Sequence, residues 1–194
     1  MSADALLRAG RALQALIEAE PEVGAGKVVL GPPPAATARL DGPRLGVFLH
    51  RIEPCADLRN RERMVRPAAP GEPAEARPGL PLDLRFLITA FGPEDETGLG
   101  GEQLILLGGA LRALARGGRL PSGEHPDGQA PRLTIDPLSA EELSRIWSLF
   151  PNTSFQTSVG VLATPVWIGL GEPTRAPPVM GVRFRYGSKE EQAP

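Results

Sequence analysis

The chain has 194 residues, with 21 Lys or Arg against 23 Asp or Glu, which gives a formal net charge of −2 at pH 7. This length suits one domain, and a charge so close to zero argues against a dedicated nucleic-acid-binding protein, which would carry a basic excess. Hydrophobic residues make up 41% of the chain, which excludes wholesale disorder, while 23 glycines and 22 prolines are together about twice their usual share. We therefore expect a globular domain with long irregular connections.

A single cysteine and the lack of a long apolar segment indicate the cellular environment. Cys55 alone cannot form an internal disulfide or a cysteine-based zinc site, and it is typical of a reducing compartment. Residues 1–10 do not resemble a signal peptide, and the charge-free residues 150–171 are too polar to span a membrane. The sequence predicts a soluble protein of the cytoplasm.

The first part of the chain predicts one helix and two strands. Leucines at helical spacing predict an amphipathic helix over residues 3–19. A short apolar run follows at 27–30, and residues 45–52 predict a strand that is apolar on both faces and therefore covered on both sides. Residues 67–81 contain five prolines and no aromatic residue, which indicates an extended, poorly ordered loop.

The remainder predicts, in chain order, a strand, a helix, a short strand, a helix and two strands: 82–91, 102–116, 132–135, 139–150, 155–170 and 180–186. The first of these has the regular alternation of a strand. Gly117 and Gly118 end the first helix, and Ser139 with Glu142 forms the capping box that begins the second. Pro165 should kink the long strand that follows.

This order predicts the fold class. Helices are interspersed with strands but form no regular βαβ series, so we expect an α+β fold, a mixed β-sheet with helices packed on it. We expect one domain over residues 1–170, which includes the 67–81 loop, and a C-terminal strand with a polar tail over 171–194.

Two glycine-rich motifs are candidates for anion binding, and both have a simpler interpretation. Residues 24–27 read Gly-Ala-Gly-Lys, but a phosphate loop requires Ser or Thr after the lysine and then a helix, whereas Val28 and a strand follow here. Residues 98–101 precede a helix, yet the carboxylates of 94–96 would repel an anion there, and they lack the fixed geometry of a cation site. We interpret both motifs as turns.

A nucleophilic site would have to come from His50, Cys55 and Asp57, which lie within eight residues. Such a site requires the imidazole to reach the sulfur, but His50 shares its strand face with apolar residues and is better explained as a half-buried structural histidine. The sequence therefore predicts no catalytic residue, no metal site and no cofactor.

A basic run follows the second predicted strand. Glu62 and other acidic residues dilute it, and no aromatic residues are interleaved for base stacking. The run is either a solvated loop or a charged surface for protein contact. The candidate protein-contact residues, from this run and the C-terminal strand, are Arg59, Asn60, Arg61, Arg63, Arg183 and Arg185.

Four blocks of sequence, taken in order, resemble one family. They are VFLHRIEP with the following LRN (47–60), DLRFLITAFG (83–92), EQLILLGGALRAL (102–114) and PLSAEELSRIW (137–147). The family is the tail-terminator, or cap, protein of extracellular contractile injection systems and related phage-tail-like particles. The resemblance covers about residues 1–170, and it departs from the family pattern at 151–156 and at Gly160.

The resemblance implies a non-enzymatic assembly protein. Such proteins form a sixfold ring on the baseplate-distal end of the inner tube and the contractile sheath, where they stop polymerisation and join sheath to tube. The implied partners are further copies of the chain in a hexameric ring, the sheath protein and the inner tube protein, with neither nucleic acid nor membrane. The alternatives are a neck or baseplate adaptor of the same particle, or a small-molecule-binding or hydrolytic α+β domain, which a pocket with perturbed titratable groups would favour.

Overall fold

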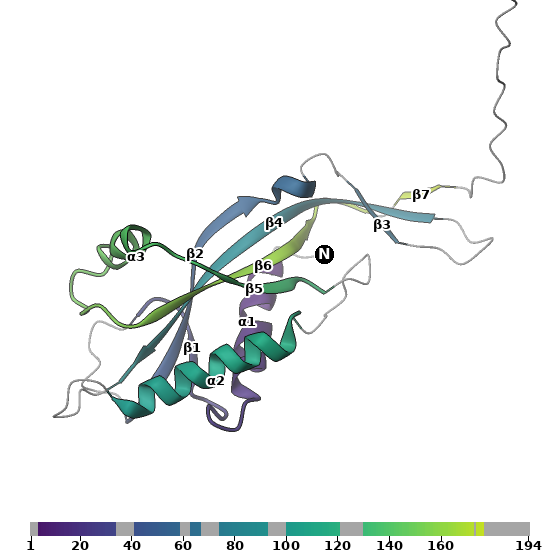
Figure 1. Ribbon diagram of the computed structural model, residues 1–194. Helices are drawn as coiled ribbons and strands as arrows, with labels where there is room; N and C mark the ends of the chain where they lie inside the picture. The colour runs from purple at the N-terminus through teal and green to yellow at the C-terminus, as the bar shows by residue number, and fades with distance from the viewer. Residues whose placement is uncertain are drawn as a thin grey trace, which may run out of the picture.

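The computed structural model describes residues 4–33, 41–58, 63–66, 74–92, 100–120, 130–172 and 174–176, with the backbone alone for 63–66, 74–77 and 174–176. The helices are α1 (Ala5–Glu18), the short 3-10 helix η2 (Ala56–Leu58), α2 (Gly101–Gly117) and α3 (Ala140–Trp147). The strands are β1 (Val28–Leu30), β2 (Arg44–Pro54), β3 (Arg63–Arg66), β4 (Ala74–Phe91), β5 (Arg132–Asp136), β6 (Ser158–Gly169) and β7 (Thr174–Ala176). The expected α+β fold with a mixed sheet is confirmed (Figure 1).

The sheet is organised around β4, which is 18 residues long. The main strand order is β1-β2-β4-β6-β5, with β1 parallel to β2 and the other neighbours antiparallel. Residues 79–91 of β4 pair with β2 and β6, whereas residues 74–78 pair with β3 on one side and β7 on the other. One strand therefore runs through two differently paired regions of the sheet.

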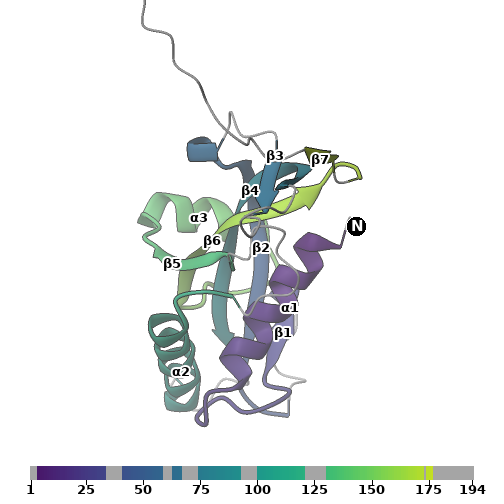
Figure 2. The ribbon, with the colours of Figure 1, turned by 90° about the vertical axis from the view of Figure 1, so that its right-hand side faces the viewer.

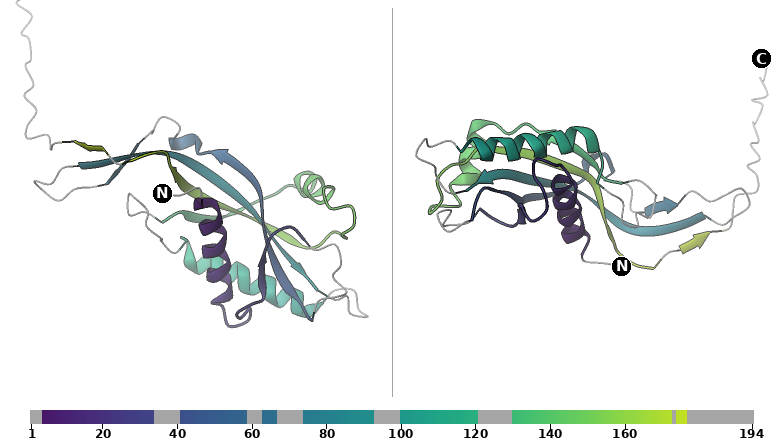
Figure 3. Two further views of the ribbon diagram at one scale, coloured as in Figure 1. Left: turned by 180° about the vertical axis from the view of Figure 1, so that it is seen from behind. Right: turned by 90° about the horizontal axis from the view of Figure 1, so that it is seen from below.

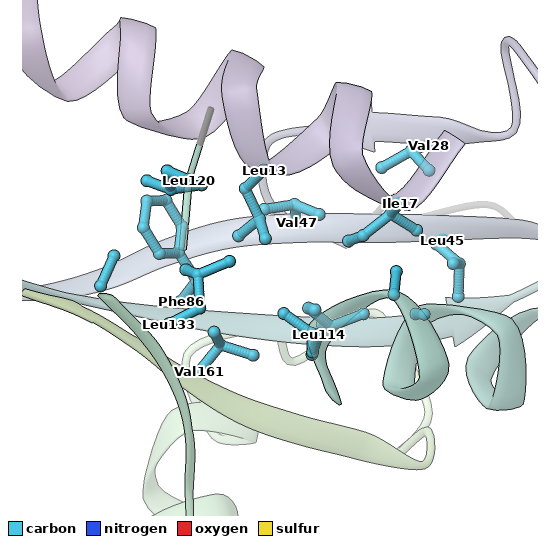
Figure 4. Packing of buried hydrophobic residues seen from close by; sticks show 14 of the residues in the cluster. Leu13, Ile17, Val28, Leu45, Val47, Phe86, Leu114, Leu120, Leu133 and Val161 are labelled. Atoms are coloured by element: carbon cyan, nitrogen blue, oxygen red, sulfur yellow. The ribbon is translucent and has the colours of Figure 1, made fainter. Parts of the chain in front are cut away.

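The hydrophobic core lies between the sheet and the helices α1 and α2, which cover one face (Figures 2 and 4). Leu13 and Ile17 of α1 are fully buried against this face, as the helical spacing of the sequence requires. Burying each such side chain contributes about 2 kcal/mol. Gly118, with φ of 57°, ends α2 in the left-handed conformation predicted for this glycine pair.

The opposite face of the sheet is covered in part by α3 and the residues after it. The capping box forms as predicted, since the Ser139 hydroxyl accepts from the Glu142 amide and Glu142 accepts from the Ser139 amide. Phe150 packs edge-on against Phe48 of β2, with ring centroids 5.5 Å apart. Because neighbouring strand residues point to opposite faces, Phe48 lies on the side away from buried Val47 and the core.

The prediction that β2 is covered on both sides holds only for its first half. Val47 is buried and Phe48 packs against Phe150, but Ile52 is 47% exposed. An 11-residue strand is about 36 Å long, whereas the 14-residue α1 is about 21 Å long, so α1 alone cannot cover all of it.

The prediction of a poorly ordered loop over 67–81 is wrong for its second half. Residues 74–81 are the first part of β4, and only 67–73 lie outside the described residues. Pro78 and Pro81 fall where β4 changes partners, because β2 ends opposite Leu82 and β3 begins opposite Pro78. A missing amide is tolerated at such a position, so the prolines do not break the strand.

The two later strand predictions have different outcomes. The irregularity predicted at Pro165 is a bulge in β6, since Val166 pairs with Leu82 but Ala163 pairs with Leu84. The strand predicted at 180–186 lies outside the described residues, as do the loops at 93–99 and 121–129. Strands β3 and β7 were not predicted.

Candidate interaction site

The glycine-rich turn after α1 is closed by a side chain of that helix. Gly24 and Gly26 both have φ of 75°, which glycine adopts readily. The Glu18 carboxylate accepts hydrogen bonds from the amides of Gly26 (3.0 Å) and Val28 (3.2 Å). The amides that a phosphate would need are thus bonded to the protein's own carboxylate, and the motif is a structural turn.

The same helix closes the outer edge of the sheet at β1. In the parallel pairing, residues 27, 29 and 31 bond towards β2, so the groups of Val28 point outwards. The Val28 carbonyl accepts from Gln14 Nε2 (2.8 Å), and the Val28 amide donates to Glu18. An edge whose polar groups are already bonded does not recruit another strand.

The other end of the main sheet, at β5, is closed over part of its length. The Leu133 amide donates to the Gly118 carbonyl (2.9 Å), and the Leu120 amide donates to the Pro131 carbonyl (2.8 Å). The chain after α2 thus lies along the start of β5. Among the described residues, the end of this edge near Ile135, which is 49% exposed, extends beyond that cover.

Two further sheet edges belong to a region that we call the β-arm: β3, the first part of β4 (74–78) and β7. Figures 1 and 3 show the β-arm extending beyond the body of the domain, away from α2 and α3. Within the described residues, β3 and β7 each pair with β4 and with no other strand. The edges of β3 and β7 that point away from β4 therefore pair with no described strand.

The β-arm contains one of the predicted protein-contact residues. Arg63 is the first residue of β3, so the basic run is not a simple loop at this point. The other predicted contact residues lie outside the described residues: Arg59, Asn60, Arg61, Arg183 and Arg185. Their contact role stays a prediction.

On the face that α3 partly covers, charged side chains from β2, β4 and β5 form an ion-pair row. Arg85 Nε lies 3.0 Å from Glu53 Oε2, and Arg85 also pairs with Asp136, while Arg51 pairs with Glu53 at 2.5 Å. The hydrogen bond from Arg85 lowers the pKa of Glu53 below its usual 4.5, and the hydrogen bond to Asp136 raises the pKa of Arg85. The row spans the sheet and ties edge strand β5 to β2.

His50 lies beside this row and is half-buried, as predicted. Burial lowers the pKa of His50 below 6.5; Arg85 and Arg51 reinforce this shift, while Asp136 and Glu142 oppose it. Its Nε2 atom is buried and has no hydrogen-bond partner among the described residues. Burial therefore disfavours the charged imidazole of His50.

The three candidates for nucleophilic chemistry do not form a catalytic group. Cys55 is buried, and its Sγ lies 3.7 Å from the hydroxyl of Thr164, which in turn bonds to Asp83. Asp57 lies in η2 and contributes no hydrogen bond to this group. Among the described residues, no three His, Cys, Asp or Glu side chains are placed to hold a metal ion, and no helix is long and apolar enough to cross a membrane.

Sequence reasoning missed both the β-arm and the ion-pair row. The alternation of residues 82–91 places Arg85 on a defined strand face, but Glu53 follows the predicted strand 45–52, and the pairing of the two strands, which brings the side chains together, is not visible in the sequence. In the β-arm, Pro78 and Pro81 made the first part of β4 resemble a loop, and its partners β3 and β7 are too short to give a clear strand pattern.

Comparison with known proteins places these features in a family context. A family model described as the Pvc16 N-terminal domain matches residues 8–181. No curated protein matches the chain. The family match extends beyond the 1–170 boundary that the sequence suggested and includes the whole β-arm.

Two solved structures have a similar fold. One is the PVC sheath/tube terminator of an extracellular contractile injection system in its extended state, with a TM-score of 0.63 and 16% identity, covering 97% of this chain and 65% of that one. The other is the anti-feeding prophage cap, the AFP tube terminating cap, with a TM-score of 0.56 and 18% identity, covering 91% and 59%. The chain spans less than two thirds of the length of either structure.

Proposed function

Because the chain belongs to the Pvc16 N-terminal domain family, we propose that it is a cap protein of a phage-tail-like contractile injection system. In this role it binds the baseplate-distal end of the inner tube and the contractile sheath, stops their polymerisation and joins one to the other. The observation that carries the proposal is the family match over residues 8–181, supported by the similarity of the fold to a sheath/tube terminator and a tube terminating cap.

The proposed working form is a hexameric ring of this chain, in contact with the sheath protein and the inner tube protein. A ring of identical subunits uses a heterologous contact that closes on itself, so each subunit offers two different surfaces to its neighbours. Two parts of the sheet differ and support this proposal. Side chains of α1 close the edge at β1, while the β-arm extends beyond the body of the domain.

We further propose that the role is structural, with no catalytic step, and that the ring assembles in the cytoplasm before the particle is released. The buried Cys55 beside a threonine hydroxyl and the ion-paired carboxylates support a structural role, because each of these groups already has a partner within the fold. No contact with nucleic acid or membrane is part of the proposal.

Deletion of the gene tests the capping role. Tube and sheath subunits should still polymerise, because their mutual contacts do not need a cap, but the particles should vary widely in length or their sheaths should detach or contract early. Electron microscopy of purified particles, with the wild-type gene restored as the control, measures the length distribution. Particles of uniform length and normal stability without this protein would contradict the proposal and favour an accessory adaptor.

A further inference from the structure

We propose that the outer edge of β3 is a docking edge for an extended, acidic segment of another protein chain, which adds to the β-arm as a further strand. The inference deepens the proposed function, since it supplies a contact by which a cap could hold a neighbouring subunit, but it can fail separately. It rests on the pairing of the sheet, the backbone geometry of β3 and the charge of the β-arm.

The first step is a comparison of the sheet edges. The outward groups of Val28 in β1 are bonded to side chains of α1, and the start of β5 is bonded to residues 118–120. In contrast, β3 has four residues and pairs with β4 alone within the described part of the chain. It is also longer than β7, which has three residues.

The second step identifies which backbone groups of β3 point outwards. The Pro78 carbonyl accepts from the Leu170 amide (2.9 Å), so Pro78 bonds away from β3. Arg63, which pairs with Pro78, is therefore in a non-hydrogen-bonded position, and antiparallel ladders alternate such positions with bonded ones. Met64 and Arg66 bond to β4, whereas the amides and carbonyls of Arg63 and Val65 point outwards.

The third step concerns charge. The paired stretches of the β-arm carry four arginines and one glutamate, namely Arg63, Arg66, Arg77, Arg175 and Glu75, although the whole chain has a net charge of −2. Main-chain hydrogen bonds provide the affinity in strand addition, and side chains provide the specificity. A basic edge selects an acidic strand.

The charge also argues against a second copy of the same edge as the occupant. Two β3 edges brought together would place two arginines of one chain, Arg63 and Arg66, close to the same two arginines of the other. Like charges that face each other across a strand pair destabilise it. The edge therefore favours a different segment, one that carries carboxylates.

The test uses the full chain and two synthetic peptides, one of alternating glutamate and valine and one of alternating lysine and valine. We expect the glutamate peptide to bind more tightly, on the order of tenfold, with a preference that falls as salt is added. Hydrogen exchange should slow at the Arg63 and Val65 amides when it binds. Val65→Pro removes an outward amide without removing a bond to β4, so it should abolish binding and leave the melting temperature nearly unchanged.

A charge-reversed chain, Arg63→Glu with Arg66→Glu, keeps every backbone group and should prefer the lysine peptide. Equal binding of the two peptides, no binding of either, or unchanged binding by Val65→Pro would overturn the proposal. Binding that appears only after truncation following Ala176 would also overturn it, because the chain's own C-terminal segment would then be the occupant. Since no particle is needed, these outcomes are independent of the capping test.

Discussion

At the scale of single residues, a few glycines set how closely the chain packs. A Cβ added to Gly160 of β6 would lie 2.5 Å from the Asp136 carbonyl oxygen and 2.9 Å from the Leu138 side chain. Asp136 is the last residue of β5 and Leu138 follows it on the way to α3, so Gly160 permits the chain to leave β5 close to β6. A side chain here would separate β5 from β6 next to the ion-pair row.

Gly160→Ala should therefore lower the free energy of unfolding by about 1–3 kcal/mol, the usual cost of overpacking. The matched control is Gly108→Ala, because a Cβ on Gly108 meets nothing within 4 Å and alanine favours a helix by about 1 kcal/mol over glycine. Urea denaturation of both variants measures the difference. A Gly160→Ala protein as stable as wild type would contradict this account of the packing.

The ion-pair row gives a pH dependence of known sign. Arg85 holds the pKa of Glu53 below its usual 4.5, so the pairing stabilises the fold above that value and the stabilisation is lost as the pH falls through the folded-state pKa. Glu53→Gln should lower stability at neutral pH and reduce its loss in acid. Denaturation curves over the acid range measure this, with exposed Glu141→Gln as the control; an unchanged acid profile of Glu53→Gln would remove Glu53 from the row.

At the scale of elements, the helices show how much the sequence reveals. The spacing of leucines predicted α1, the glycine pair predicted the end of α2, and the capping box predicted the start of α3, because each signal is local. The β-arm depends on contacts between strands distant in sequence, with Arg63 paired to Pro78 and Ala76 to Thr174, so no local pattern reveals it. The same reason explains why the ion-pair row was not predicted.

Helix α2 provides a test of which leucines face the core. Leu107 is 5% exposed in the core, whereas Leu104, three residues earlier, is 49% exposed. Leu107→Ala should cost about 2–5 kcal/mol, because it leaves a cavity, and Leu104→Ala should cost much less. Chemical denaturation compares the two, and equal losses would mean that the inner and outer sides of α2 are wrongly assigned.

At the scale of the whole molecule, stability should be divided along β4. Residues 82–91 lie between β2 and β6 over a helix-covered core, while residues 74–78 lie in the β-arm between two short strands. Regions with fewer buried contacts open more readily. Native-state hydrogen exchange of the full chain should therefore show faster exchange in 74–78 than in 82–91, and equally slow exchange in both would show that the β-arm is as stable as the body.

The continuity of β4 also has a mechanical consequence. Its ladder bonds to β2 and β6 lie across the strand direction, so a pull on residues 74–78 along the strand loads these bonds together, in shear, rather than one after another. Many bonds must then break at once before the strand slides. A subunit held by its β-arm would transmit tension directly into the centre of its sheet, where the fold is best able to resist it.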